Sequence, residues 1–412
     1  MTTVRAVALL VPKETDFVRI GVAVPNAVAA SVSVSSTHIL EWLAISLTPG
    51  LGPTKARKLV EHFGSAEAVF HASLTELEGT GIQAVSAQSI ATGKSAELAR
   101  EEIARAAGAG VTVVSTEDLC YPPRLKEIYD PPLVLYVRGN PEVLTQPGIA
   151  MVGTRHPTPY GSGMAERLAC DLASQGLVII SGMARGVDTA SHRGAISAKG
   201  KTVAVFGTGV DVIYPKENSR LSEQILAMGG ALISEFAMGS FAAPQNFPIR
   251  NRILSGMSVG VLVVEAAEYS GTRITARCAL EQNRDVYAVP GNVTNKNSWG
   301  PNTLIKQGAK LVATWEDVWE DLPPEVKLAL TPTSSPESGK ATSASLFPDE
   351  GLPPHEKKIL SLLKADEATQ IDEIVERLEA EMSSSEIFAA LFELELTGKI
   401  RQMPGKNFVK SF

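Results

Sequence analysis

The stretch SGMARGVDTASHRGA, Ser181 to Ala195, lies between two apolar segments of the 412-residue chain. LVII at 177–180 precedes it and TVAVFG at 202–207 follows it, which predicts a strand that runs through a glycine-rich turn into a helix. Such a turn brings backbone N–H groups and a helix N-terminus close to an anion. The arginine and histidine side chains add groups that carry positive charge or a proton. We therefore expect a site for phosphate or a nucleotide here.

The same pattern recurs between Gly148 and about Leu322. Apolar strand candidates alternate with amphipathic helical stretches, which is typical of a doubly wound, mostly parallel α/β sheet. The predicted strands are 148–153, 177–181, 202–207, 231–235, 259–266 and 285–290. We place this Rossmann-like domain at residues 111–322.

Each predicted strand ends in small, polar or charged residues, and the carboxyl ends of parallel strands share the rim of the sheet where ligands bind. A single glycine-rich turn is equally well explained as a tight connection, but several on one rim favour a shared site. FPIRNRILSG at 247–256 and YSGTRITARCALE at 269–281 add arginine, amide and hydroxyl groups. A lone arginine would be explained by a surface ion pair, so the inference depends on the combination.

Several common sites are excluded by their motifs. The chain has no complete G-x-G-x-x-G fingerprint, no P-loop and no G-x-S-x-G elbow between a strand and a helix, since its GMSVG at 256–260 precedes a predicted strand. The net charge of −7 gives no global basic field, so a polyanion site must be a local patch. Three widely spaced cysteines indicate a reduced, cytoplasmic chain without a thiolate zinc site. We expect no membrane segment, no metal and no cofactor.

The N-terminal part divides into two regions. Residues 1–36 are interpreted as a disordered or mis-annotated extension. Residues 37–110 form a helical domain whose segment LTPGLGPTKARKLVEHFGS at 47–65 resembles a helix-hairpin-helix or SAM-like element. Its turn would offer a secondary DNA contact, or it would only permit a tight turn in a small protein-contact domain. The residues proposed for that contact are Gly50, Gly52 and Lys55.

The C-terminal part also divides into two. Residues 323–354 are rich in Pro, Ser and Thr and predict a linker. Residues 355–412 predict three helices and a terminal hairpin, which resemble a winged helix. Its predicted recognition helix at 383–397 contains three glutamates and no lysine or arginine. Because a helix that enters a major groove normally needs positive charge, this pattern favours a protein-contact or regulatory module.

Two pairs of residues have alternative interpretations. Asp188 and His192, one turn apart, could form an acid–base pair. We favour a structural role, in which Asp188 supports the helix start and His192 orients a neighbouring loop. Glu235 and Glu265 at strand ends could be catalytic, but we expect them to hold the pocket arginines in place.

The motifs GTRHPTPYG, SGMARGVDTASHRGA, FPIRNRILSG, SGTRITA and AVPGN…GPNTLIKQGAKLV occur in this order and together resemble the DprA/Smf family of bacterial DNA-processing proteins. The resemblance covers about residues 37–322, and the C-terminal module fits the family's variable tail. It implies a non-catalytic, dimeric protein that binds single-stranded DNA, protects it and helps to load the RecA recombinase during natural transformation. Carried over by motif, the site comprises Gly153, Thr154, Arg155, Ser181, Gly182, Arg185, Gly186, Arg250, Asn251, Arg252, Ser270, Gly271 and Thr275.

Two other functions remain open. One is a nucleotide hydrolase of the lysine-decarboxylase-like type, whose P-G-G-x-G-T-x-x-E motif is incomplete in this chain because Thr275 stands where the glutamate belongs. The other is a nucleotide sensor without a polymer ligand. The helix-hairpin-helix-like turn favours a polymer, because a free nucleotide needs no second phosphate-contacting element.

Overall fold

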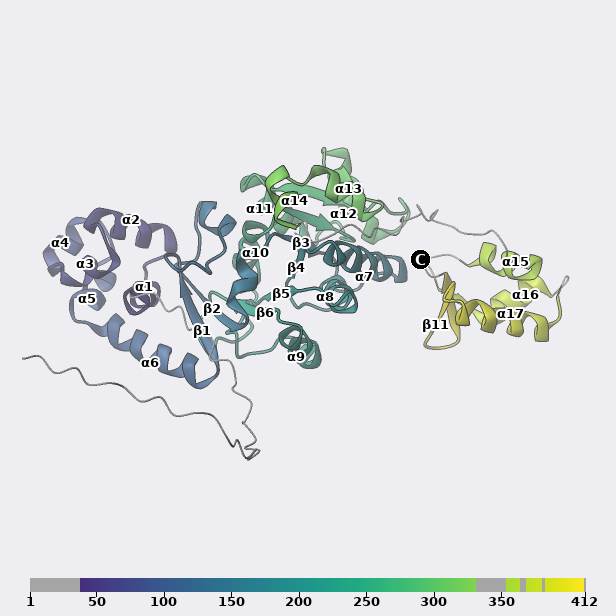
Figure 1. The fold of residues 1–412 in the computed structure, drawn as a ribbon, viewed down its shortest axis with the longest axis horizontal. Helices are drawn as coiled ribbons and strands as arrows, with labels where there is room; N and C mark the ends of the chain where they lie inside the picture. Colours follow the sequence, from purple (N-terminus) through teal and green to yellow (C-terminus); the bar gives the residue numbers. More distant parts are fainter. Residues whose placement is uncertain (1–37, 331–352, 364–367, 380–381, 411–412) are drawn as a thin grey trace, which may run out of the picture. The chain divides into compact units, whose positions relative to one another are not determined.

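The computed structural model describes residues 38–330, 353–363, 368–379 and 382–410 (Figure 1). The predicted extension at 1–36 lies outside the described residues, as does 331–352 of the predicted linker.

The predicted N-terminal helical domain is present. Its helices are α1 (Ile39–Ser46), α2 (Pro53–Phe63), α3 (Ala66–His71), α4 (Leu74–Gly79), α5 (Ala84–Ala91) and α6 (Lys94–Gly108). The turn between α1 and α2 has Gly50 at φ +75°, a conformation that favours glycine, and α2 starts at Pro53 as expected. Buried side chains such as Trp42, Leu43 and Leu59 form the core of this domain.

The central domain is built on a nine-stranded sheet with the order β1-β2-β6-β5-β4-β3-β7-β8-β9. Its strands are β1 (Val111–Ser115), β2 (Val134–Gly139), β3 (Gly148–Val152), β4 (Val178–Ser181), β5 (Thr202–Val205), β6 (Ala231–Ser234), β7 (Gly260–Val263), β8 (Asp285–Ala288) and β9 (Lys310–Leu311). All six predicted strands are confirmed and pair in parallel, from β6 to β8. β1 and β2 add an antiparallel edge.

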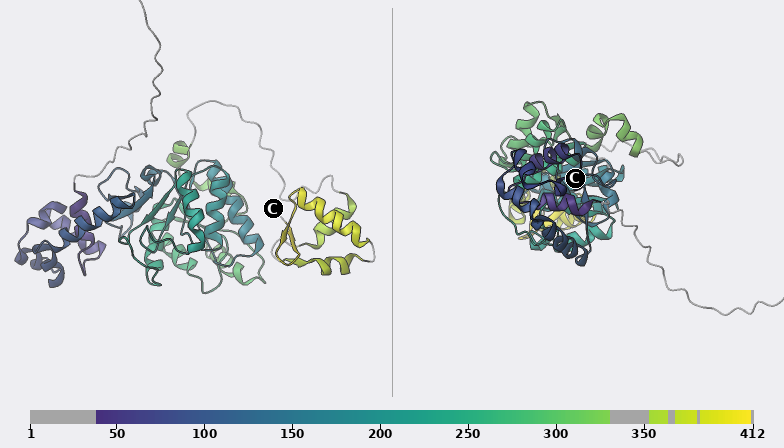
Figure 2. Two further views of the ribbon diagram at one scale, coloured as in Figure 1. Left: turned by 90° about the horizontal axis from the view of Figure 1, so that it is seen from below. Right: turned by 90° about the vertical axis from the view of Figure 1, so that its left-hand side faces the viewer.

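Helices cover both faces of this sheet (Figures 1 and 2), because successive residues of a strand point to opposite faces. On β3, Ile149 and Met151 pack with α7 (Pro159–Ser174) and α8 (Val187–Ser197). Ala150 and Val152 pack with α10 (Asn246–Met257) and α11 (Thr272–Glu281). The domain also contains α9 (Ser219–Ala227), α12 (Trp299–Lys306) and α13 (Trp315–Asp321).

The predicted linker starts too early. Residues Pro324–Leu330 form helix α14, whose Val326 is buried in the same core as α7. The two prolines at 323 and 324 suggested a linker, but a proline in the first turn of a helix is well tolerated.

The C-terminal module is the expected winged helix. It consists of α15 (Pro354–Leu362), β10 (Thr369–Gln370), α16 (Ile371–Leu378), α17 (Ser384–Leu396) and the hairpin β11 (Ile400–Met403) and β12 (Asn407–Lys410). Its core is a separate cluster that includes Ile359, Ile374, Leu391 and Phe408. Within the described ranges, no helix has the length and apolar character needed to cross a bilayer.

Candidate functional site

A cleft of about 1030 Å³ opens at the carboxyl ends of the parallel strands. It lies where the chain order of the sheet reverses, since β4, β5 and β6 follow β3 on one side and β7 and β8 lie on the other. This reversal separates the loops after β3 and β7, which creates the crevice in which ligands of such sheets bind. Both loops contribute to the lining, with Thr154 and Arg155 after β3 and Ser270 and Gly271 after β7.

Hydrogen bonds fix the loops that form the wall. The Thr154 N–H donates to the Glu265 carbonyl at 2.7 Å, which ties the loop after β3 to the end of β7. The Asn297 side chain donates to the His156 carbonyl at 2.9 Å. The Asn297 carbonyl accepts from the Ala266 N–H at 2.7 Å. These hydrogen bonds join the loops of the wall to one another.

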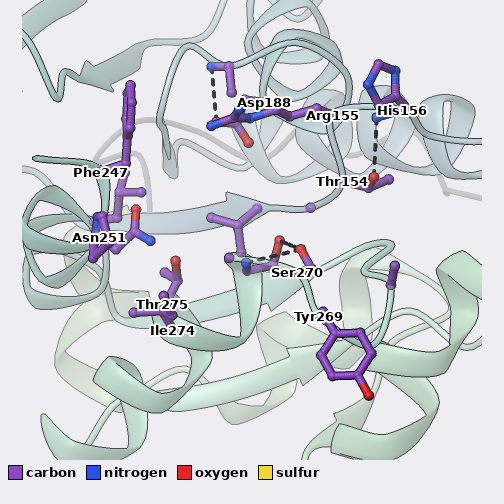
Figure 3. Close-up of a pocket in the computed structure, with 18 of the residues that line it drawn as sticks. Thr154, Arg155, His156, Asp188, Phe247, Asn251, Tyr269, Ser270, Ile274 and Thr275 are labelled. Atoms are coloured by element: carbon purple, nitrogen blue, oxygen red, sulfur yellow. Dashed lines mark hydrogen bonds between the residues drawn. The ribbon is translucent and has the colours of Figure 1, made fainter. Parts of the chain in front are cut away.

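Aromatic rings line the opposite side of the cleft. The Arg155 guanidinium lies 5.7 Å from the centre of the Phe247 ring. The centre of the Tyr214 ring lies 5.8 Å from that of the Phe247 ring, and the two ring planes are tilted relative to each other. Gly207 permits this arrangement, because a Cβ there would come within 2.9 Å of the Phe247 ring. Figure 3 shows Phe247 and Asn251 from α10 and Ile274 and Thr275 from α11 on one side, with Thr154 and Arg155 opposite. A cation beside flat rings suits an anion that carries an aromatic base.

Arg250 lies beneath this surface and is almost fully buried. Its Nη1 donates to the Val205 carbonyl at 2.7 Å, while its buried Nε finds no hydrogen-bond partner among the described residues. Burial lowers the pKa of Arg250 to about 10, although the carboxylate of Asp188 acts in the opposite direction. Arg250 thus gives the floor of the cleft a positive charge with unused donor capacity.

The structure brings most of the predicted site residues together. Those that line the cleft are Gly153, Thr154, Arg155, Arg250, Asn251, Ser270, Gly271 and Thr275. The other five do not line it: Ser181, Gly182, Arg185, Gly186 and Arg252.

The turn at 181–186 makes hydrogen bonds to other groups of the chain. The N–H groups of Gly182 and Ala184 both donate to Asp188 Oδ2 at 3.2 Å, and the Ser181 hydroxyl donates to the Met151 carbonyl at 2.7 Å. An external anion at these two amides, as expected from the sequence, would have to displace a buried carboxylate that already accepts from them. Gly182 instead makes room for Arg250, whose guanidinium a Cβ would strike.

The two outlying arginines form ion pairs. Arg185 is exposed and pairs with Glu217. Arg252 is buried and pairs with Glu235 and with Asp130, the latter at 3.2 Å. Arg250 and Arg252 on either side of Asn251 therefore have different surroundings, because residues two apart on a helix point in different directions.

The structure also shows the contacts of the four residues that had alternative interpretations. Glu235 holds Arg252, as expected. Glu265 accepts from the Thr158 N–H at 2.9 Å at the start of α7, and its expected hold on a pocket arginine stays a prediction. Asp188 lies in the first turn of α8, where it accepts from the N–H groups of the preceding turn, which agrees with a structural role. His192 is fully buried and bonds the Thr202 hydroxyl at 2.7 Å, so it contacts the start of β5 rather than a loop.

Sequence reasoning missed several side chains of the cleft. They are His156, Tyr214, Phe247, Tyr269, Lys296 and Trp299. Phe247 is the first residue of FPIRNRILSG, a motif that was assigned to the site for its arginine and amide groups. Tyr269, which is 90% exposed at the rim, had a recognisable pattern, since a large aromatic residue stood in a polar loop at a strand end.

The predicted secondary contact lies apart from the cleft lining. Gly52 caps α2 in an extended conformation, and Lys55 in its first turn is exposed. Gly50 packs against the Gln83 side chain. Among the described residues, no cluster of acidic, histidine or cysteine side chains is arranged to hold a metal.

Comparison with known proteins identifies the family. The family model of DNA recombination-mediator protein A matches residues 112–323, and that of the DprA winged helix domain matches 343–406. Protein Smf of Escherichia coli K12 is 42% identical over 286 residues, which cover 69% of this chain and 74% of that protein. Protein Smf of Synechocystis is 33% identical over 89% of this chain and 97% of that protein.

A solved structure agrees with this match. The crystal structure of DNA processing protein A from Streptococcus pneumoniae has 34% identity and a TM-score of 0.60, covering 68% of this chain and 96% of that one. The resemblance found in the motifs is thus confirmed by sequence and by fold. The chain belongs to the DNA recombination-mediator protein A family, the DNA-processing proteins also called DprA or Smf.

Proposed function

We propose that this protein binds single-stranded DNA in the cleft between the loops after β3 and β7. It acts in the cytoplasm as a homodimer that protects incoming DNA and helps to load RecA recombinase during DNA uptake, without catalysing a reaction. The observation that carries the proposal is the cluster of Arg155, Phe247 and Tyr214, which line the same cleft as the buried Arg250. Guanidinium groups bind the phosphate backbone and the rings bind bases.

The chemistry of the cleft favours a single strand over a duplex. In a duplex the base faces are stacked on one another, so they are not available to Phe247 or Tyr214. A duplex binder also relies on a broad basic surface, whereas this chain has a net charge of −7. A local cleft that offers both cations and rings needs unstacked bases.

The size of the cleft favours a polymer over a free nucleotide. Small-molecule pockets usually measure about 300–1,000 Å³. The volume of about 1030 Å³ here is slightly above this range. For the hydrolase alternative, Thr275 is a buried hydroxyl in the place of the expected carboxylate.

The contacting residues are proposed to be the eight predicted ones that line the cleft, together with Phe247 and Tyr214. Gly182 and Arg252 are proposed to support the lining from behind. Lys55 with Gly50 and Gly52 remains the proposed secondary contact on α2.

The test is fluorescence anisotropy of a labelled single-stranded oligonucleotide across a salt series. Wild type is compared with Arg155→Ala, and Arg185→Ala is the matched control because it removes an exposed arginine that pairs with Glu217 outside the cleft. We expect Arg155→Ala to weaken binding by about tenfold and to reduce the salt slope by about one, with Arg185→Ala close to wild type. Equal loss in both variants, or competition by free nucleotide as strong as by oligonucleotide, would contradict the proposal.

The role in recombination has its own test. RecA filament assembly is followed on single strands that carry single-strand-binding protein, with and without this protein. We expect wild type to accelerate filament assembly and Arg155→Ala to give no acceleration. If binding is intact but assembly is unchanged, the mediator role fails while the DNA site stands.

A further inference from the structure

Helix α17 of the winged helix carries a row of exposed apolar side chains. Phe388, Phe392 and Leu396 are 52%, 61% and 68% exposed. They are spaced four residues apart, so they lie on one face of the helix. The opposite face carries the side chains that build the module's core, among them Ile387 and Leu394. The exposed row is therefore not needed to fold the module.

The charges of α17 are unusual for the recognition helix of a winged helix. It contains Glu386, Glu393 and Glu395 and no lysine or arginine. At 100° per residue, Glu393 and Glu395 fall on opposite sides of the apolar row. Glu386 is fixed in a capping box with Ser383 at the helix start. Carboxylates therefore flank the C-terminal half of the apolar row on both sides.

The basic residues of the module lie elsewhere. Lys399, Arg401 and Lys406 are in and around the hairpin. Residues 353–410 contain eleven acidic and eight basic side chains. A DNA phosphate backbone would be repelled by α17, whereas an apolar surface with positive groups beside it would complement the helix in both respects.

We propose that the α17 face, defined as Phe388, Phe392, Leu396 and the flanking Glu393 and Glu395, is a docking surface for a partner protein. The partner presents an amphipathic helix with a row of large apolar side chains and lysine or arginine beside it. Two such helices bury their apolar rows against each other, and the flanking charges pair across the contact and fix its register. This contact is independent of the DNA cleft.

The test uses the full-length protein and a synthetic amphipathic peptide of about 18 residues, with leucines on one face and lysines beside them. The comparison peptide has glutamates in place of the lysines. Binding is measured by isothermal titration calorimetry to wild type, Phe388→Ser/Phe392→Ser and Glu393→Lys. Leu328→Ser is the matched control, since Leu328 is 78% exposed on α14, outside the module.

We expect the basic peptide to bind wild type and Leu328→Ser equally, and the double variant at least about tenfold more weakly. Glu393→Lys should weaken the basic peptide and strengthen the acidic one, and it tests the surface even if the double variant fails to fold. Single-stranded DNA affinity should be unchanged in all variants, which separates this proposal from the DNA site.

Three results would overturn the proposal. The first is equal peptide affinity in all variants. The second is self-association in analytical ultracentrifugation that Phe388→Ser/Phe392→Ser abolishes, which would assign the surface to a second copy of the chain. The third is a loss of duplex DNA binding in the double variant, which would assign it to DNA.

Discussion

The Oε1 atom of Glu102 accepts a hydrogen bond of 2.6 Å from the backbone N–H of Met238. Glu102 lies on α6 of the helical domain and is 5% exposed, while Met238 belongs to the loop between β6 and α10. That loop supplies Ala242 and Pro244 to the cleft lining. One edge of the cleft is therefore anchored by the helical domain.

Replacing Glu102 should loosen this edge. Glu102→Ala leaves the buried Met238 N–H without an acceptor, at a cost of about 1–3 kcal/mol in the free energy of unfolding. We also expect single-stranded DNA affinity to fall several-fold, although Glu102 does not line the cleft. Hydrogen exchange at residues 236–246 and anisotropy measure the two effects. Glu101→Ala, on an exposed neighbour, is the control, and the same exchange pattern in both variants would refute the anchor.

Phe247 should contribute through its aromatic face. Phe247→Leu keeps an apolar side chain but removes the ring on which Arg155 lies. Base–aromatic stacking is worth about 1–3 kcal/mol, so affinity for single strands should fall roughly five- to 150-fold with little change in the salt slope. Anisotropy with a salt series separates this loss from the loss of a cation. A reduced slope with unchanged low-salt affinity would show that the ring does not stack on DNA.

The sequence predicted the fold more completely than the site. The buried runs at 148–153 and 259–266 are long, apolar and flanked by glycine-rich turns, so β3 and β7 could be located. The position of the site at the rim of the sheet could also be predicted, because the carboxyl ends of parallel strands lie on one side. The hydrogen-bond or ion-pair partner of each polar group could not be predicted from the sequence. Asp188 accepts from the backbone of the turn at 182–184, and Asp130 pairs with Arg252 only because tertiary packing brings them together.

His192 should make stability depend on pH. Burial lowers its pKa from 6.5 to about 3 in the folded protein. The unfolded chain therefore binds an extra proton between these values, and stability falls as the pH drops below 6.5. Between pH 6.5 and 5 the loss from this group is about 2 kcal/mol.

Urea unfolding at pH 7 and pH 5 measures this loss. His192→Gln should be less stable at both values but should lose about 2 kcal/mol less than wild type between them. Burial raises the pKa of Asp188, which acts in the opposite direction, but that contribution is common to both proteins. An equal loss in wild type and variant would mean that His192 does not titrate on unfolding.

Gly182 should be as sensitive as a residue that contacts DNA, although it does not line the cleft. A Cβ at this position would strike the Arg250 guanidinium, which lies between the turn and the Val205 carbonyl. Because the backbone of the turn is held by Asp188, Arg250 must move in Gly182→Ala. We expect a cost of about 1–3 kcal/mol in stability, and a loss of DNA affinity close to that of Arg250→Ala. Gly79→Ala, where a Cβ meets nothing within 4 Å, is the control.

The double variant Gly182→Ala/Arg250→Ala is decisive, because its DNA affinity should equal that of Arg250→Ala alone. Additive losses would show that Gly182 acts on the cleft by another route.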